Sequence, residues 1–367
     1  MAAHWIKPFI RDRMKPDQFA YVLGPGKGAS TALALLYHKI LQSLDKDSGA
    51  VRLLSVDFSR AFDKLPHSSI RRAVIDFALP KEAAVWISNF LTNRQQRTRV
   101  GTELSDWSPV PSGVPQGSVI GPLLFCMVLD SLSPLNNNNT MLKYADDVSI
   151  LCYTRSPQED TLQAEWDNIV SWSIRIGLPI NTSKCAVVNF ITKKDMSVSP
   201  VSVTEGTYIP TVSSLKLLGI TISEDLRWSA HFRNVIAKVS KRLFVIRFLR
   251  RSGAPPAILL KAYNALIRPV MLYCYPAFCN APKHLFQKLV RLESRAFRIA
   301  NSASSQPSFL ECAQRSCSNM MNQIVRQPDH PLRQCFSARE VTHKNSCPLR
   351  APFTKTERFK NSLIRFL

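Results

Sequence analysis

Residues Leu142 to Leu151 read Leu-Lys-Tyr-Ala-Asp-Asp-Val-Ser-Ile-Leu, and they place two adjacent carboxylates, Asp146 and Asp147, between two short apolar runs. An apolar run, a polar tip and a second apolar run predict a β-hairpin. Neighbouring acids at its tip repel each other unless a cation compensates their charge or their pKa rises. Hard divalent cations such as Mg²⁺ take carboxylate oxygens and keep positions open for substrate phosphates. The stretch therefore indicates a metal site, and a solvated acidic turn is the alternative.

The composition narrows the class of protein. At 367 residues the chain can form two or three lobes, because single cores rarely exceed about 250–300 residues. Its 48 Lys and Arg against 26 Asp and Glu give a net charge of +22, which indicates a polyanionic partner, nucleic acid first and an anionic membrane second. The longest apolar run, Val119 to Leu129, is too short to span a bilayer, and the N-terminus has no signal-peptide layout. We therefore expect a soluble intracellular protein, in the nucleus, the cytoplasm or both, with reduced cysteines.

A third acid follows a predicted strand. The run from Val51 to Phe58 is rich in β-formers and carries Asp57 at its C-terminal end. Open sheets bind ligands at strand ends, so Asp57 is a candidate for chemistry. Asp63 lies just before a helix expected over Ser68 to Phe77, and we interpret it as a turn or capping acid. A core helix is expected over Ala32 to Leu44, capped by Ser30 or Thr31.

A basic segment and a glycine loop supply further candidates. After a helix over residues 80–91, Asn93 to Val100 carries three arginines among amides. Arginine matches phosphate oxygens in a bidentate fork, although a solvated basic hairpin fits the spacing equally well. The loop from Ser112 to Ser118 leads into an apolar helix expected over Val119 to Leu132. Its glycines permit close approach of a ligand, and Gln116 offers a donor and an acceptor to a base or sugar; a plain helix-entry loop is the alternative.

The C-terminal third is strongly basic. After a strand pair around Gly219, helical spacing begins near His231 and continues to about residue 300. Residues 231–300 contain 14 Lys and Arg but one acid, Glu293. Such a lobe predicts a surface for a phosphate backbone, with an amphipathic membrane face as the competitor. In the basic tail beyond residue 300, zinc binding by Cys and His residues is a minor alternative, because their spacing fits no standard zinc finger. These residues are Cys312, Cys317, Cys335, Cys347, His330 and His343.

Four blocks together resemble the reverse transcriptase of non-LTR (LINE-type) retrotransposons. They are Ser55 to Asp63 (Ser-Val-Asp-Phe-Ser-Arg-Ala-Phe-Asp), Gly113 to Ser118 (Gly-Val-Pro-Gln-Gly-Ser), Tyr144 to Asp147 (Tyr-Ala-Asp-Asp) and Gly177 to Lys184. Each block is weak alone, but their order and separation are specific, and weaker similarity extends over nearly the whole chain.

The resemblance implies an α+β fold, a right-hand polymerase with fingers, palm and thumb, an antiparallel palm sheet and a helical C-terminal thumb. It implies partial fingers over residues 1–50 and a palm over 51–230, with inserted fingers elements at about 80–112. The basic thumb covers 231–300, and 301–367 form a basic, partly disordered extension. The implied partners are an RNA template, a DNA primer, their hybrid and deoxynucleoside triphosphates, with no membrane.

The resemblance also implies roles for individual residues. Asp57, Asp146 and Asp147 hold two Mg²⁺ ions, or Mn²⁺ in their place, with the Phe58 backbone carbonyl as a further ligand. Phe62 excludes a 2′-hydroxyl on the incoming sugar. Lys184 protonates pyrophosphate. Gln116, Gly117 and Tyr144 border the nucleotide, and Lys216, Leu217, Leu218 and Gly219 form the primer grip.

The chain departs from the family pattern near its start. Val22 stands where relatives carry an arginine. From the resemblance we expect the upstream fingers block and an endonuclease domain before residue 1 to be missing. We expect a truncated element in which Arg97 and Arg99 take over part of triphosphate binding. Two functions stay open: an RNA-directed DNA polymerase, favoured by the three acids, and a catalytically inactive or domesticated nucleic-acid-binding protein, favoured by the missing fingers and the net charge. A membrane-surface protein is a distant third.

Overall fold

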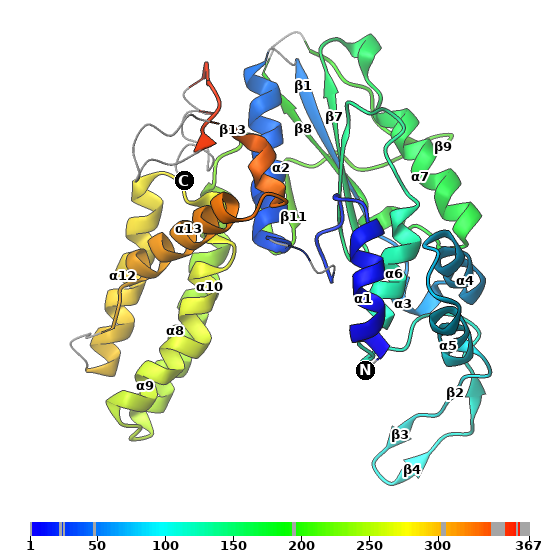
Figure 1. The fold of residues 1–367 in the computed structure, drawn as a ribbon. Coiled ribbons are helices and arrows are strands. Elements are labelled where there is room, and N and C mark those ends of the chain that lie inside the picture. The colour runs from blue at the N-terminus through cyan, green and yellow to red at the C-terminus, as the bar shows by residue number, and fades with distance from the viewer. Residues whose placement is uncertain are drawn as a thin grey trace. The chain divides into compact units, whose positions relative to one another are not determined.

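A computed structural model describes residues 2–21, 24, 26–46, 49–192, 196–301, 306–338, 349–356 and 359. The chain divides into two compact units, and each is described by itself (Figure 1). The first unit comprises Met1–Lys27, Gly49–Asn189 and Lys193–Thr211, and the second comprises Gly28–Ser48, Phe190–Thr192 and Val212–Leu367. Residues 28–48 therefore group with the C-terminal half, whereas the sequence placed them with the fingers; the subdomain assignment stays a prediction.

The first unit is built around a four-stranded sheet in the order β6-β7-β1-β8. The strands are β1 (Ala50–Val56), β6 (Thr140–Tyr144), β7 (Asp147–Thr154) and β8 (Ala186–Ile191). Both the β6–β7 and the β7–β1 pairs are antiparallel. The apolar residues of β1 and β7 are almost entirely buried, which is the pattern of strands covered on both faces. The predicted acidic hairpin is therefore present as β6 and β7.

Helices pack with this sheet in one apolar core. Residues of α4, α6 and α7 share a buried cluster with β1 and β7, and Trp166 and Trp172 are its largest members. The helices of the unit are α1 (Ala2–Arg13), α3 (Ala61–Lys64), α4 (His67–Asp76), α5 (Lys81–Leu91), α6 (Gly121–Asp130) and α7 (Leu162–Ile176). Short 3₁₀ turns lie at Pro157–Glu159 and Thr182–Lys184. The core holds the ends of the strands that carry the acids.

A charged side chain lies inside this core. Arg52, in the middle of β1, is 1% exposed and forms an ion pair with Asp160. Its Nε donates to Asn189 Oδ1 at 3.0 Å, and NH2 donates to the Ser199 carbonyl at 2.7 Å. A buried guanidinium is tolerated because its donors are satisfied.

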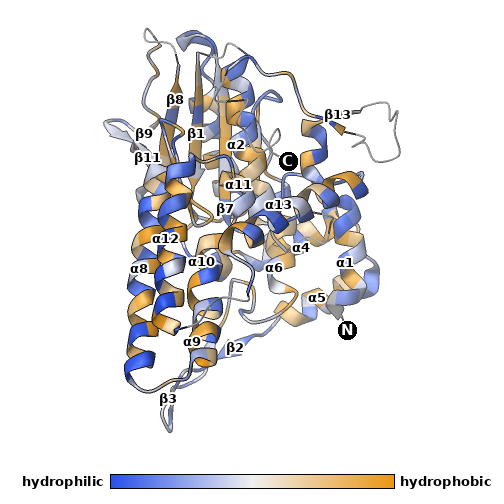
Figure 2. Cartoon of the chain, turned by 90° about the vertical axis from the view of Figure 1, so that its left-hand side faces the viewer, coloured by the Kyte–Doolittle hydropathy of each residue, from blue (hydrophilic) through white to orange (hydrophobic). Residues whose placement is uncertain are grey.

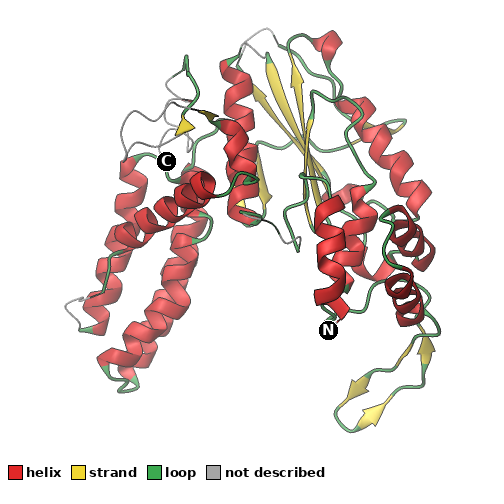
Figure 3. Cartoon of the chain, in the orientation of Figure 1, coloured by secondary structure: helices red, strands yellow, loops and turns green. Residues whose placement is uncertain are grey.

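An exposed hairpin projects beyond α5 (Figure 3). Its inner pair is β2 (Gln95–Gln96) with β5 (Ser108–Pro109), and its outer pair is β3 (Arg99–Val100) with β4 (Glu103–Leu104). All residues of these four strands are exposed. A separate small hairpin pairs β9 (Ser202–Thr204) with β10 (Thr207–Tyr208).

The second unit is mainly helical. Its long helices α8 and α12 alternate hydrophilic and hydrophobic residues along their length, so one face packs and the other carries the basic side chains (Figure 2). The helices are α2 (Ala29–Asp45), α8 (Ser229–Arg251), α9 (Pro256–Ala262), α10 (Arg268–Leu272), α11 (Tyr275–Phe278), α12 (Lys283–Ala300) and α13 (Phe309–Arg326), with a π-helical turn at Tyr263–Ile267 and a 3₁₀ turn at Pro331–Cys335. The strand pairs are β11 (Ser214–Leu217) with β12 (Ile220–Ser223) and β13 (Ser337–Ala338) with β14 (Leu349–Arg350).

Two predicted helix starts were wrong. α2 begins at Ala29 after Gly28, so Ser30 and Thr31 lie inside the helix and cap nothing. The helix expected from Val119 begins at Gly121 instead, because the Ser118 hydroxyl accepts from the Gly121 N–H at 3.0 Å and Pro122 occupies the first turn. Val119 is left 68% exposed.

Two whole-chain expectations concern membranes and cysteines. Among the described residues, none of the helices combines the length and apolar character needed to cross a membrane. The eight cysteines that the structure describes are free thiols.

Candidate active site

The three acids lie at one end of the β1–β7 ladder. Val56 pairs with Val148, so the register continued by one residue sets Asp57 opposite Asp147. Tyr144 pairs with Asp147, which leaves Ala145 and Asp146 as a two-residue turn. Ala145 has φ 56, in the left-handed region that a residue with a side chain rarely adopts. Two sheet neighbours and one tight turn thus gather Asp57, Asp146 and Asp147.

Burial and mutual repulsion shift the pKa of two of these carboxyl groups. Burial, together with the charges of Asp146 and Asp57, raises the pKa of Asp147 to about 6, although other atoms of the residue are exposed. Burial and then the charge of Asp57 raise the pKa of Asp146, against a backbone hydrogen bond that lowers it. Partly buried carboxylates that repel one another form a site to which a cation can bind favourably.

The donor set fits hard divalent cations. Carboxylate oxygens are what Mg²⁺ prefers, and Mg²⁺ usually takes only one or two of them, with the rest from water and substrate phosphates. Among the described residues, no three His, Cys, Asp or Glu side chains are arranged to hold a metal ion by themselves, and this finding includes Asp57, Asp146 and Asp147. An open arrangement of acids suits ions that are shared with a substrate.

The first sequence block is bonded to the fourth. The Asp57 carbonyl accepts from the Asn181 N–H at 2.8 Å, and the Ser59 N–H donates to the Pro179 carbonyl at 2.8 Å. These bonds flank a bridge between Phe58 and Ile180, so the Phe58 carbonyl points away from that segment. The Phe58 ring is buried against Trp172, with centroids 5.7 Å apart. Lys184, three residues beyond Asn181, is exposed.

The first block is also bonded to the second. The Gly113 N–H donates to the Leu65 carbonyl and the Val114 N–H to the Phe62 carbonyl, both at 2.7 Å. Gly113 has φ 87, and a Cβ there would lie 2.6 Å from the Asp63 carbonyl oxygen, so only glycine fits. The Phe62 ring stacks on Phe125 at 4.8 Å and is partly exposed.

Gln116 is held in place by Asp63, which the sequence analysis interpreted as a turn or capping acid. Its Nε2 donates to Asp63 Oδ1 at 2.6 Å. Asp63 thus holds the loop that contains Gln116, while the next residue, Gly117, has φ 80 and open space around it. The loop combines a fixed amide side chain with a freely accessible backbone.

Sequence reasoning did not single out a supporting residue, Gln18. Gln18 is 1% exposed, and its Oε1 accepts from the Ala145 N–H at 3.2 Å and from the Ala20 N–H at 2.9 Å. It therefore holds the strained turn that carries Asp146. Apart from the weaker similarity that extends beyond the four blocks, no signal in the sequence pointed to Gln18.

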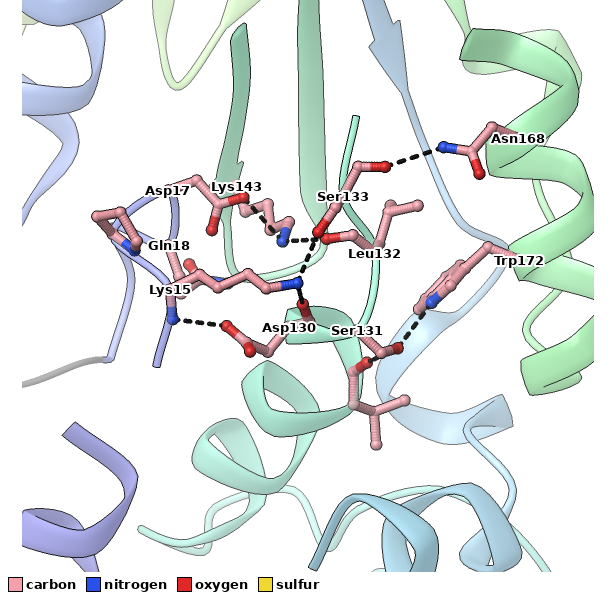
Figure 4. Close-up of polar contacts among 12 residues, drawn as sticks. Lys15, Asp17, Gln18, Asp130, Ser131, Leu132, Ser133, Lys143, Asn168 and Trp172 are labelled. Carbon is pink, nitrogen blue, oxygen red and sulfur yellow. Dashed lines mark hydrogen bonds and ion pairs between the residues drawn. The ribbon is translucent and has the colours of Figure 1, made fainter. Parts of the chain in front are cut away.

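A buried polar network anchors the same hairpin from below (Figure 4). Lys143, fully buried in β6, donates from Nζ to the Leu132 carbonyl at 2.6 Å and pairs with Asp17 Oδ2 at 2.9 Å. Burial lowers the pKa of Lys143, and the charge of Asp17 opposes that shift. Lys15 donates from its backbone to Asp130 Oδ1 at 2.8 Å and from Nζ to the Asp130 carbonyl at 2.8 Å. The segment around Asp17 is thereby fixed to β6 and to the end of α6.

The remaining predicted residues form separate groups. Arg97 stacks over Trp107 at 4.6 Å, and Arg99 donates to the Gly101 carbonyl at 2.9 Å, both within the exposed hairpin. The structure shows no contact of either arginine with the three acids among the described residues.

The Cys and His residues of the tail form no metal-binding group in the part of the chain that the structure describes, which includes Cys312, Cys317, Cys335 and His330. Three other residues named in the sequence analysis lie outside the described residues: Val22, Cys347 and His343.

The predicted primer grip is a tight hairpin in the second unit. Lys216 and Leu217 end β11, and Leu218 and Gly219 form the turn with φ 45 and φ 83, the conformation of a type I′ turn. The Tyr273 hydroxyl donates to the Leu218 carbonyl at 3.0 Å. This contact fixes the tip of the hairpin.

The site thus consists of a strand-end acid opposite an acidic turn, with the strand end bonded to two loops. Residues 2–222 match the family model described as reverse transcriptase (RNA-dependent DNA polymerase), which is more than half of the chain. The protein belongs to the reverse transcriptase family. The predicted α+β fold and the resemblance to non-LTR retrotransposon enzymes are confirmed.

Curated relatives come from insect mobile elements. The chain is 26% identical over 299 residues to a probable RNA-directed DNA polymerase from transposon BS of Drosophila melanogaster, covering 78% of this chain and 32% of that protein. It is 26% identical over 261 residues to the RNA-directed DNA polymerase from mobile element jockey of the same species, covering 68% and 28%. The chain thus spans about 30% of the length of these relatives. Among solved structures, apo telomerase from Candida tropicalis aligns over 89% of this chain and 58% of that one, with 9% identity and a TM-score of 0.46.

Proposed function

We propose that this chain is the polymerase part of a non-LTR retrotransposon reverse transcriptase and extends a DNA primer on an RNA template. The observation that carries the proposal is the register of β1 and β7, which gathers Asp57, Asp146 and Asp147 at one strand end. Family membership supports the same activity. In this proposal the three carboxylates and the Phe58 carbonyl would hold two divalent ions.

The proposed chemistry is an in-line phosphoryl transfer. Mg²⁺ at such a site supplies activation of the primer 3′-hydroxyl and neutralisation of the leaving pyrophosphate. Phe62, held against Phe125, would exclude a 2′-hydroxyl from the incoming nucleotide. Gln116, Gly117 and Tyr144 would border the nucleotide, and Lys184 would give a proton to pyrophosphate. The hairpin from Lys216 to Gly219 would position the primer.

A primer-extension assay tests the proposal. The purified chain is incubated with a primed RNA template and deoxynucleotides, in Mg²⁺ and in EDTA. Extension that depends on Mg²⁺ supports the polymerase. Binding of the template without extension supports the alternative, a catalytically inactive nucleic-acid-binding protein, which the net charge of +22 favours.

Mg²⁺ should also stabilise the protein without any substrate. A cation that binds the folded site raises the free energy of unfolding by mass action, and each kcal/mol raises Tm by about 2–4 °C in a domain of this size. Thermal unfolding of the parent should therefore shift upward with Mg²⁺ at constant ionic strength. Asp12 is an exposed acid of α1, so the Tm of Asp12→Asn should rise with Mg²⁺ as much as that of the parent. The Tm of Asp146→Asn should not rise with Mg²⁺. Equal shifts in both variants would count against ion binding by the three acids.

Gln18→Met should lower the extension rate through the turn alone. The change removes the acceptor of the Ala145 N–H with little change in volume, and an unsatisfied buried donor costs about 1–3 kcal/mol. Without this hydrogen bond the turn holds Asp146 less firmly in place. We therefore expect a roughly tenfold lower kcat with little change in the KM for nucleotide. Gln163→Met is the matched control, because Gln163 accepts from the Ser202 N–H instead. The same kcat in both variants would show that Gln18 does not position the turn.

A further inference from the structure

The exposed hairpin, residues 92–111 and here called the arm, carries large apolar side chains that are about half or more exposed. Val100 is 74% exposed, Leu104 49% and Trp107 58%. A two-stranded hairpin without a covered face is marginally stable in water. Three large apolar groups on such an element indicate a surface that a partner contacts.

Planar groups are stacked along the arm and the adjoining helix. In the arm, the Arg97 guanidinium lies 4.6 Å from the centroid of the Trp107 ring. At its base, the Arg94 guanidinium lies 5.5 Å from the centroid of Phe90. On α5, Phe90 in turn stacks on the exposed Trp86, with centroids 5.3 Å apart and planes 9° from parallel. Each guanidinium is thus held over an aromatic ring, and Trp86 adds a second exposed ring beside Phe90.

A groove joins the base of the arm to the loop of Gln116. Its volume is about 630 Å³, and Arg60 and Arg94 contribute the cations of its lining. Gln96 and Pro109 line it from the arm, and Gln116 lines it at the loop. A strand that followed the groove would pass from Arg94 and Gln96 at the base of the arm to Gln116.

The chemistry of this surface selects the partner. The arm also contains Glu103 and Asp106, so charge alone does not define it. Exposed aromatic rings close to arginines are features that bind single-stranded nucleic acid, because every base has a flat face and every nucleotide has a phosphate. A duplex keeps its bases stacked inside and cannot use such rings.

We infer that the arm and the groove bind the single-stranded part of the template RNA as it approaches Gln116. A base stacks on Trp107, a second lies against Trp86, and Arg60, Arg94 and Arg97 contact the phosphates between them. The inference rests on the proposed function, because it takes the template to be RNA and Gln116 to border the nascent pair. It gives Arg97 a contact with the template strand, in addition to the triphosphate contact expected from the sequence.

The test measures binding by fluorescence anisotropy in EDTA, where no extension occurs. One probe is a blunt RNA–DNA hybrid, and the other is the same hybrid with an RNA overhang of about ten nucleotides, within the range that single-strand sites cover. The parent should bind the overhang probe more tightly. Trp107→Ala should weaken that binding about tenfold, the effect of losing one stacked base, and leave the blunt probe unchanged.

Matched variants exclude a general effect of removing tryptophan. Trp107→Phe keeps a stacking face and should retain most of the affinity, whereas Trp5→Ala, on the exposed side of α1, should change neither probe. Because Trp107 is exposed, Trp107→Ala should unfold at the temperature of the parent. Parental affinity of Trp107→Ala for the overhang, or an equal loss on both probes, would overturn the inference. Loss of self-association in Trp107→Ala at unchanged RNA affinity would overturn it as well, because the arm would then bind a second copy of the chain.

The two proposals fail separately. Primer extension by the parent reports on the polymerase, whereas the difference in affinity between the two probes in EDTA reports on the arm. A chain that does not extend primers, yet needs Trp107 for the overhang, removes the polymerase proposal alone. A chain that extends primers with equal affinity for both probes removes the arm's role alone.

Discussion

Primer extension by Asp146→Asn should fall by more than about a thousandfold relative to the parent. Asparagine keeps the size of the side chain but removes one of three adjacent negative charges at the end of β1 and β7. Metal ions at such sites supply several kcal/mol of transition-state stabilisation, and each 1.36 kcal/mol is about tenfold in rate. Asp57→Asn and Asp147→Asn should have losses of similar size, because the acids act as one unit.

Further variants distinguish the loss of a carboxylate charge from a general loss of structure. A double variant of Asp57 and Asp146 should be no slower than either single variant, since residues that act together are not additive. Asp12→Asn should extend primers like the parent. Asp146→Asn should still bind the primed template in an anisotropy assay. Extension by Asp146→Asn within a few fold of the parent would contradict the assignment of these acids.

Arg52→Ala should have the largest effect on stability. Removing one partner of a buried ion pair costs about 3–5 kcal/mol, because the other charge stays buried without compensation. Here Asp160 loses its cation, and Asn189 and the Ser199 carbonyl lose their donors. A domain has about 5–15 kcal/mol of stability in total, so the denaturant midpoint should fall markedly in chemical unfolding followed by circular dichroism.

An exposed pair offers the matched comparison. Arg72 pairs with Asp76 on α4 at 3.1 Å, and their side chains are 77% and 53% exposed. Arg72→Ala should change the unfolding free energy by less than about 1 kcal/mol. Similar midpoints for the two variants would show that the Arg52 contacts contribute little.

Local patterns were enough to predict much of this site. The hairpin with Asp146 and Asp147 follows from alternating apolar runs around two acids, and the strand to Asp57 follows from its β-branched and apolar residues. The order of four short blocks predicted the family. These features depend on neighbours in the chain, which a sequence displays directly.

Features that depend on distant partners were not predictable in the same way. Arg52 in a β-run gives no sign that Asp160 and Asn189 neutralise it. Gln18 acquires its role only because segment 17–19 lies beside β6, which the parallel bridge to Lys143 records. The starts of two helices were missed because a backbone or hydroxyl contact, rather than residue preference, decided where the first turn begins.

The way in which the arm is attached allows its length and sequence to be changed. The Val110 N–H donates to the Arg94 carbonyl at 2.9 Å, so the two ends of the arm already meet. Segments whose ends touch can be shortened, lengthened or exchanged without pulling on what they leave behind. The arm is thus a natural place for grafting a foreign recognition hairpin onto this scaffold, or for replacing residues 95–109 by a short glycine-rich link, while the sheet below stays intact.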